Sequence, residues 1–253
     1  ELVDDVEVLV VLTRVDEVLL LVLVELDDVL DVELDVDDVE EYLGRGYRVR
    51  GEMNGSPFEW RGELHAPPVD RPLRIASLNC VKNVTAHSAW NRQGVWFPHD
   101  ELVAGVAAQD PDFLFFAGDQ IYEGDLNGVD RRKIVLDYHT KYQRWLRSFA
   151  ELCRDRPCVI IPDDHDVGHG NVWGENGKNS TLPGSADGGY KFPVKYVNQV
   201  QRQQSWHLPD CPDPAPVNRG ISVYFTRITV GGVDFAVLED RKFKSGPAGK
   251  IPQ

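Results

Sequence analysis

The sequence predicts an α/β protein, a layered domain of sheet and helices preceded by the remnant of a small N-terminal β-domain. Two apolar runs of strand length, at 113–116 and 159–161, each end abruptly in carboxylates. A long segment between them, 134–155, carries apolar residues at helical spacing. Repeated alternation of strand and helix is typical of a largely parallel central sheet.

The net negative charge of the chain comes from its first 40 residues. The formal net charge is −14, and residues 1–40 alone hold 15 acidic residues and one basic residue, Arg14. This low-complexity segment has three interpretations: strands of an N-terminal β-domain, a disordered acidic tail, or translation of a wrong reading frame. The last two are favoured. The remainder has no basic stripe, so we expect no nucleic-acid binding.

Residues 41–70 are predicted to be the end of the N-terminal β-domain followed by a linker. Segments 47–53 and 58–64 have strand character and flank a turn, and the Pro-rich stretch 66–72 indicates a stiff connection. No apolar run reaches the length of about 18 residues that a membrane span requires. No signal peptide is visible.

The main domain is predicted over residues 71–253. Its expected helices and strands are a strand at 73–80, a helix at 100–109, a strand ending at Asp119, a helix at 134–155, a strand ending at Asp163, a helix at 194–208, and a hairpin of 221–228 and 233–238. The Gly-rich stretch 168–189 is predicted to be a long loop at the site.

Candidate site residues stand where these strands end. Asp119 follows the first apolar run, Asp164 and His165 follow the second, and Cys80 ends the strand that begins at 73. Because the carboxyl ends of parallel strands meet at one edge of a sheet, we expect these side chains to lie together. Carboxylates crowded around an imidazole repel one another unless a cation neutralises them, which favours a hydrolytic metal centre. A surface loop of solvated charges is the alternative.

Three motifs resemble the PhoD-like, or alkaline phosphatase D, branch of the metallophosphoesterases. In chain order they are Ser77-Leu78-Asn79-Cys80, Gly118-Asp119-Gln120-Ile121-Tyr122-Glu123 and Asp163-Asp164-His165-Asp166. The resemblance covers roughly residues 42–253 and implies a metallophosphoesterase-like layered fold. It also implies a phosphate-ester substrate and an extracytoplasmic location. The oligomeric state is not predicted.

The resemblance also implies a set of metal ligands. Cys80, Asp119 and Tyr122 would ligate iron(III), and Asp119 would bridge to a second cation, calcium or another divalent metal, that Asp164 also ligates. His165 would lie near the phosphate, where it would stabilise transition-state charge or assist the leaving group.

There are two further catalytic candidates, Asn171 and Arg241. Asn171 lies in a Gly-rich loop and is a candidate for contacting a metal or a phosphate oxygen; an ordinary loop is the alternative. The resemblance aligns the family's Leu-Asp-Thr-Arg segment with Leu238-Glu239-Asp240-Arg241, so Asp240 or Arg241 is a candidate for facing the site. The alternative is a salt-bridged strand end.

The sequence departs from the family pattern in several places. Pro162 replaces a Trp, Asp166 replaces a Glu, and the downstream Gly-Asp-x-His motif is absent, so a domain truncated at its C-terminus is expected. The expected reaction is hydrolysis of phosphomonoesters or phosphodiesters by a metal-activated hydroxide. The alternative is a catalytically inactive fragment, or an interaction protein with a degenerate hydrolase-like body and an acidic tail. Motifs of P-loop, dinucleotide and serine-hydrolase enzymes are absent.

Overall fold

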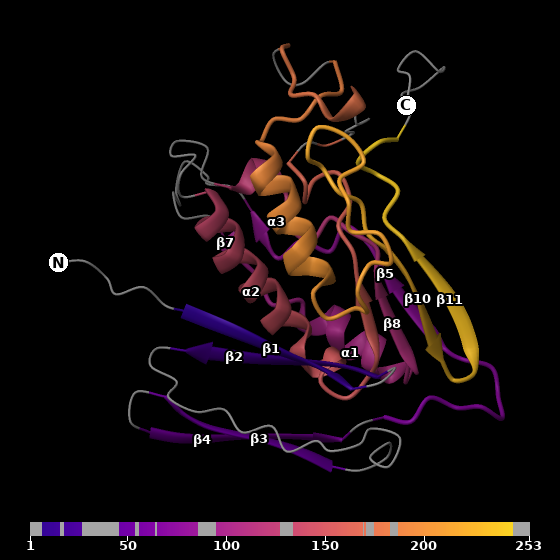
Figure 1. The fold of residues 1–253 in the computed structure, drawn as a ribbon. Coiled ribbons are helices and arrows are strands. Elements are labelled where there is room, and N and C mark those ends of the chain that lie inside the picture. Colours follow the sequence, from indigo (N-terminus) through magenta and orange to yellow (C-terminus); the bar gives the residue numbers. More distant parts are fainter. Residues whose placement is uncertain are drawn as a thin grey trace.

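The computed structural model describes residues 7–15, 18–26, 46–53, 56–63, 65–85, 95–126, 134–168, 170, 175–182 and 187–244. Within them the chain forms a mixed α/β fold (Figure 1). Its strands and helices are, in order, β1 Glu7–Val15, β2 Val18–Leu26, β3 Gly46–Met53, β4 Ser56–Glu63, β5 Ile75–Leu78, β6 Val84–Thr85, β7 Val95–Trp96, α1 Asp100–Ala108, β8 Phe113–Phe116, a 3-10 turn Glu123–Asp125, α2 Ile134–Cys153, β9 Cys158–Ile160, a 3-10 turn Glu175–Gly177, α3 Val194–Ser205, β10 Phe225–Val230 and β11 Val233–Leu238.

A three-stranded parallel sheet in the order β5-β8-β9 lies at the centre of the fold. Its register pairs Ile75 with Phe113 and Leu114 with Cys158. The helices α1 and α2 make the two crossovers between these strands, as parallel pairing requires. The predicted parallel arrangement is therefore confirmed, and all three strands deliver their carboxyl ends to one edge.

Helices cover one face of this sheet. Side chains of α1, α2 and α3 share one apolar cluster with the alternate sheet residues Leu114, Phe116 and Ile160. The cluster is rich in aromatic side chains from α2, of which Trp145 and Phe149 pack against Phe116. The helical spacing of apolar residues in this segment thus marks the face that enters the core.

The hairpin of β10 and β11 covers the opposite face. A second apolar cluster joins Phe113, Val159 and Ile161 to hairpin residues such as Ile228 and Val237. Since successive side chains of a strand point to opposite faces, the odd and even residues of β8 and β9 serve the two clusters. The result is three layers, with helices, parallel sheet and hairpin side by side (Figure 1). The predicted hairpin is present, but its first strand begins at Phe225 instead of 221.

Two antiparallel hairpins precede the linker. Strands β1 and β2 pair from Glu7–Leu26 to Val15–Val18. Strands β3 and β4 pair over the segment predicted as the end of a β-domain. The backbone N–H groups of Glu63 and His65 donate to Asp155, after α2. The division of the chain into three domains stays a prediction.

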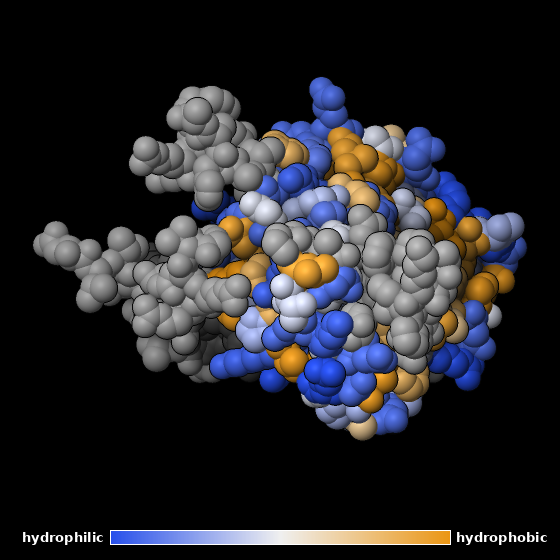
Figure 2. All heavy atoms as spheres, turned by 90° about the horizontal axis from the view of Figure 1, so that it is seen from above, coloured by the Kyte–Doolittle hydropathy of each residue, from blue (hydrophilic) through white to orange (hydrophobic). Residues whose placement is uncertain are grey.

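Polar side chains cover much of the described surface that Figure 2 shows, with apolar patches among them. The most exposed large apolar side chains lie on separate parts of the chain, namely Val69, Leu136, Trp206, Val217 and Leu238. Among the helices that the structure describes, none has the length and apolar character needed to cross a membrane.

Asp112 fixes the start of β8, and its substitution should weaken the fold in a pH-dependent way. Its carboxylate, 1% exposed, accepts two hydrogen bonds from the Arg71 guanidinium, at 2.7 and 2.8 Å, and one from the Arg74 backbone N–H. The bonds from Arg71 hold the pKa of Asp112 below its usual range. The stabilisation is therefore present above the unfolded-state pKa of about 3.9 and is lost as pH falls through the folded-state value.

We expect Asp112→Asn to lower the free energy of unfolding at pH 7 by about 1–3 kcal/mol, because charge-assisted bonds to a buried group are lost. The deficit should shrink in acid. Urea unfolding across a pH series measures both effects. Asp110→Asn, at an exposed neighbour paired to Arg74, is the control and should stay close to wild type. A deficit that is equal at every pH would contradict this account.

Candidate metal centre

The three loops that follow β5, β8 and β9 are joined at the carboxyl edge of the sheet. The N–H of Cys80 donates to the carbonyl of Gly118 at 3.2 Å, and the N–H of Ala117 donates to the carbonyl of Leu78 at 2.8 Å. The N–H of Ile161 donates to the carbonyl of Phe116 at 3.1 Å. These bonds extend the parallel pairing by one step before the chain turns, so the residues that follow enter a shared space.

The loops after β8 and β9 approach one another closely at Gly118. It has a φ of +100°, and a Cβ atom placed on it would lie 2.3 Å from the Cβ of Asp163. Cys80 and Asp119 both have left-handed φ values of 59°, a region that side chains other than Gly adopt only at a cost. The local sequence thus permits a close crossing that brings two acidic loops together.

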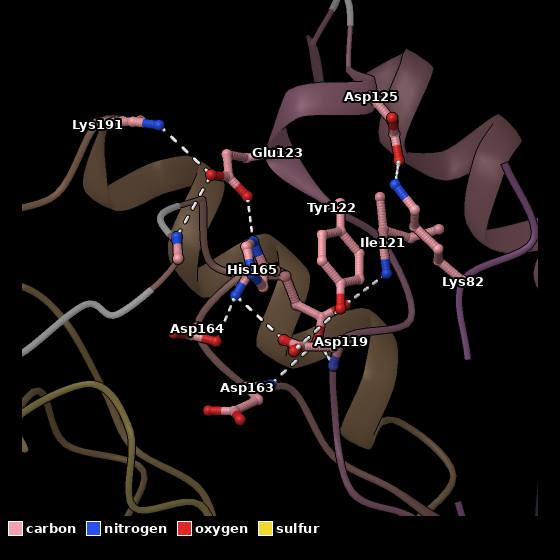
Figure 3. Close-up of polar contacts among 12 residues, drawn as sticks. Lys82, Asp119, Ile121, Tyr122, Glu123, Asp125, Asp163, Asp164, His165 and Lys191 are labelled. Atoms are coloured by element: carbon pink, nitrogen blue, oxygen red, sulfur yellow. Dashed lines mark hydrogen bonds and ion pairs between the residues drawn. The ribbon is translucent and has the colours of Figure 1, made fainter. Parts of the chain in front are cut away.

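Asp119 lies at the centre of the site and contacts both Tyr122 and His165 (Figure 3). Its Oδ2 lies 3.3 Å from the Cys80 sulfur and 3.5 Å from the Tyr122 hydroxyl. The backbone N–H of His165 donates to Oδ1 of Asp119 at 3.3 Å and to Oδ1 of Asp164 at 3.0 Å. One ligand atom each from Asp119, Asp164 and His165 lies within 4.8 Å of the others. The structure therefore brings together the predicted residues from all three strand ends.

Arg241 reaches the same cluster from the end of the hairpin. Its Nη2 lies 2.5 Å from Oδ2 of Asp164, and its Nε lies 3.4 Å from Oδ1 of Asp163. Arg241 thus faces the site and is also salt-bridged, so both of the alternatives considered for it hold. Asn171, the other catalytic candidate, lies outside the described residues.

Several acidic groups of the cluster have raised pKa values in the absence of a cation. Burial raises the pKa of Asp119, to which the charge of Asp164 adds. Burial likewise raises the pKa of the Cys80 thiol and of the Tyr122 phenol, and neighbouring Asp119 contributes to both. For Asp163, burial and the charges of Asp164 and Asp119 outweigh Arg241 and raise the pKa to about 6. The common cause is burial, to which neighbouring negative charge adds.

His165 is held on two sides. Its Nδ1 lies 2.6 Å from Oε2 of Glu123, and its ring stacks on that of Tyr122 with centroids 4.0 Å apart. Glu123 also accepts the Gly170 N–H at 3.3 Å and lies 3.4 Å from Lys191 Nζ. Burial alone would raise the pKa of Glu123, but the bond and charge of His165 lower it to about 2. With Nδ1 engaged, Nε2 is the ring nitrogen left for a ligand.

Sequence reasoning missed three residues around the cluster. Glu123 ends the motif that begins at Gly118, but no function is predicted for it. It lies 42 positions from His165, so the sequence gives no sign of their contact. Lys191 carried no signal in the sequence. Asp166 was counted among the crowded carboxylates, whereas its side chain is fully buried and accepts backbone N–H groups.

The residues present fit a metal ion. Carboxylate oxygens, a thiol sulfur, a phenol oxygen and an imidazole nitrogen are all recognised metal ligands. Asp119 and Asp164 are buried, which limits competition from water, whereas Cys80 is exposed. A bound cation would oppose the raised pKa values of Cys80, Asp119 and Tyr122. The arrangement is therefore suited chemically to bind at least one cation between Asp119 and Asp164.

Comparisons with known proteins include a remote structural likeness. No family model matches the chain, and no curated protein matches it. A solved structure described as "Structure of PhoD" aligns at 17% identity with a TM-score of 0.46, over 81% of this chain and 39% of the other. The chain thus spans well under half the length of that structure. Membership of the PhoD-like family stays a prediction.

Substitution of Gly118 tests the close crossing of the loops. Because an added Cβ would meet Asp163, and because φ is positive, we expect Gly118→Ala to lower the free energy of unfolding by about 3 kcal/mol or more. Gly105→Ala is the matched control, since Gly105 lies within α1 with nothing within 4 Å of an added Cβ. That control should stabilise by about 0.5–1 kcal/mol. Urea unfolding measures both free energies. Equal changes in the two variants would refute the close approach of the loops at Gly118.

Substitution of Glu123 tests its hold on His165. The bond and charge of Glu123 offset the effect of burial and raise the pKa of His165, so Glu123→Gln should lower that pKa in metal-free protein. Histidine NMR titration measures it, with the resonance assigned by its loss in His165→Gln. Lys191→Met removes a cation from the same carboxylate and should not lower the pKa. An unchanged pKa in Glu123→Gln would show that the contact is not formed in solution.

Proposed function

We propose that this chain hydrolyses phosphate esters with the help of metal ions held by Cys80, Asp119, Tyr122 and Asp164. The observation that carries this proposal is the gathering of buried acids, a thiol and a phenol at one sheet edge, where their pKa values are raised by burial and mutual proximity. Such a cluster is costly without a cation. The predicted motifs support the same assignment.

The ligand types favour two different cations. Thiolate and phenolate oxygen donors suit iron(III), which we assign to Cys80, Asp119 and Tyr122. Carboxylates suit a hard divalent ion such as calcium, which we assign to Asp119 and Asp164. When bound, such cations supply positive charge for phosphate oxygens and lower the pKa of water.

The chain's own residues would bind and orient the substrate. His165 contacts Glu123 and stacks on Tyr122. In this proposal it stabilises transition-state charge or holds a proton at Nε2 for the leaving oxygen of the ester. The guanidinium of Arg241 offers paired N–H donors of the geometry that phosphate oxygens accept. Asn171 is a further candidate for a phosphate contact. Assays with a phosphomonoester and with a phosphodiester would show which of the two classes the chain hydrolyses.

Metal content and turnover test the proposal together. The purified chain should retain transition metal at near-stoichiometric amounts and hydrolyse an aryl phosphate or a bis-aryl phosphate. Asp119→Asn should abolish metal retention and lower turnover by more than about 100-fold, since loss of even an outer-shell partner commonly costs 10–100-fold. Elemental analysis and release of the aryl alcohol provide the two measurements.

Asp234→Asn is the control for this experiment. Asp234 is an exposed carboxylate on β11 that bonds Arg227 and Thr229, so its loss should leave metal content and turnover at the wild-type level. A folded wild-type chain that holds no more metal than Asp119→Asn would refute the proposal. That result would favour an interaction protein with a degenerate hydrolase-like body.

A further inference from the structure

The carboxylate of Asp166 lies beneath the candidate metal centre and has no contact with solvent. Its side chain is 0% exposed, although it belongs to the same run of residues as Asp164 and His165. Among the described residues, those with ligand atoms within 4.8 Å of one another are Asp119, Asp164 and His165. Asp166 is not part of this group. Its role must therefore be sought in the contacts that its two oxygens make.

Each oxygen of Asp166 accepts two hydrogen bonds. Oδ2 accepts the backbone N–H of Asp119 at 2.6 Å and that of Asp163 at 3.0 Å. Oδ1 accepts the backbone N–H of Ile121 at 2.9 Å and the side-chain amide of Gln204 at 2.8 Å. An ionised carboxylate offers about four lone-pair positions. All of them are occupied by donors, so Asp166 has no position left for a metal ion.

Three of these donors belong to the two loops that carry candidate ligands. Asp119 and Ile121 lie in the loop after β8, and Asp163 precedes Asp164 in the loop after β9. Because a single oxygen receives the N–H groups of Asp119 and Asp163, it fixes the separation of the two loops. The N–H of Asp119 therefore bonds this carboxylate and not a neighbouring strand.

We infer that Asp166 is a positioning residue that sets the spacing of Asp119 and Asp164 before any metal binds. The expected effect on metal affinity rests on the proposed function. The hydrogen bonds to Asp166 do not depend on it. A preset pair of ligands avoids the cost of ordering two loops at the moment of binding. Partners behind the ligands commonly contribute 10–100-fold to metal affinity.

Asp166→Asn is the direct test. The amide keeps the shape of the side chain but replaces one accepting oxygen with a donor, which opposes the N–H groups on that side. We expect the affinity for Mn²⁺, measured by the loss of the free-ion electron paramagnetic resonance signal, to fall by about 10–100-fold. Thermal unfolding of the same samples reports whether the variant is folded.

Asp112→Asn is the matched control, because Asp112 is a buried carboxylate that accepts a backbone N–H at the opposite end of β8. It should lose stability yet bind Mn²⁺ as wild type does. Equal affinity in Asp166→Asn and wild type would overturn the inference and leave the proposed function standing. An equal loss in both variants would also overturn it, since the effect would then be general destabilisation.

A measurement on the unaltered chain keeps the inference testable if Asp166→Asn does not fold. The N–H groups of Asp119, Ile121 and Asp163 should exchange with deuterium slowly in metal-free protein, as slowly as those of the central strand β8. Rapid exchange at these positions without metal would show that the loops are not held in advance, and would overturn the inference. Absence of Mn²⁺ binding by wild type would refute the proposed function alone, because this exchange does not depend on metal.

Discussion

The concentration of negative groups at one edge of a parallel sheet is the constraint on which the rest of the site depends. Three strands end together, and the chain places acids, a thiol and a phenol after them. Burial makes this arrangement unfavourable unless positive charge or hydrogen-bond donors compensate. Arg241, the backbone N–H of His165 and the donors to Asp166 supply part of that compensation. A cation would supply the rest.

The layers on the two faces of the sheet explain why the strand ends stay in register. Helices pack on one side and the β10–β11 hairpin on the other, so β8 and β9 are apolar on both faces. The buried sheet cannot slip by one residue without exchanging its two apolar faces. Asp119 and Asp164 therefore meet because of packing far from them. Arg241 reaches the site for the same reason, since the hairpin that carries it is part of the core.

Much of the fold was predictable from local pattern. The apolar run that forms β8, the helical spacing along α2 and the alternation of strands and helices led to a parallel sheet, which the structure contains. The meeting of Cys80, Asp119 and Asp164 followed from a general rule about strand ends. The contact of Glu123 with His165, and the four bonds to Asp166, were not predictable, because both depend on how loops cross after the strands end.

The sequence by itself determined which residue types stand at the strand ends and on which faces the apolar side chains lie, because periodicity and strand length are local properties. It did not determine which carboxylates face a common space and which become internal acceptors. Asp164 and Asp166 are two residues apart and chemically identical, yet one lies in the acidic cluster and the other is saturated by N–H groups. Only the tertiary structure decided between them, because most of the donors that surround Asp166 come from segments far from it in the sequence.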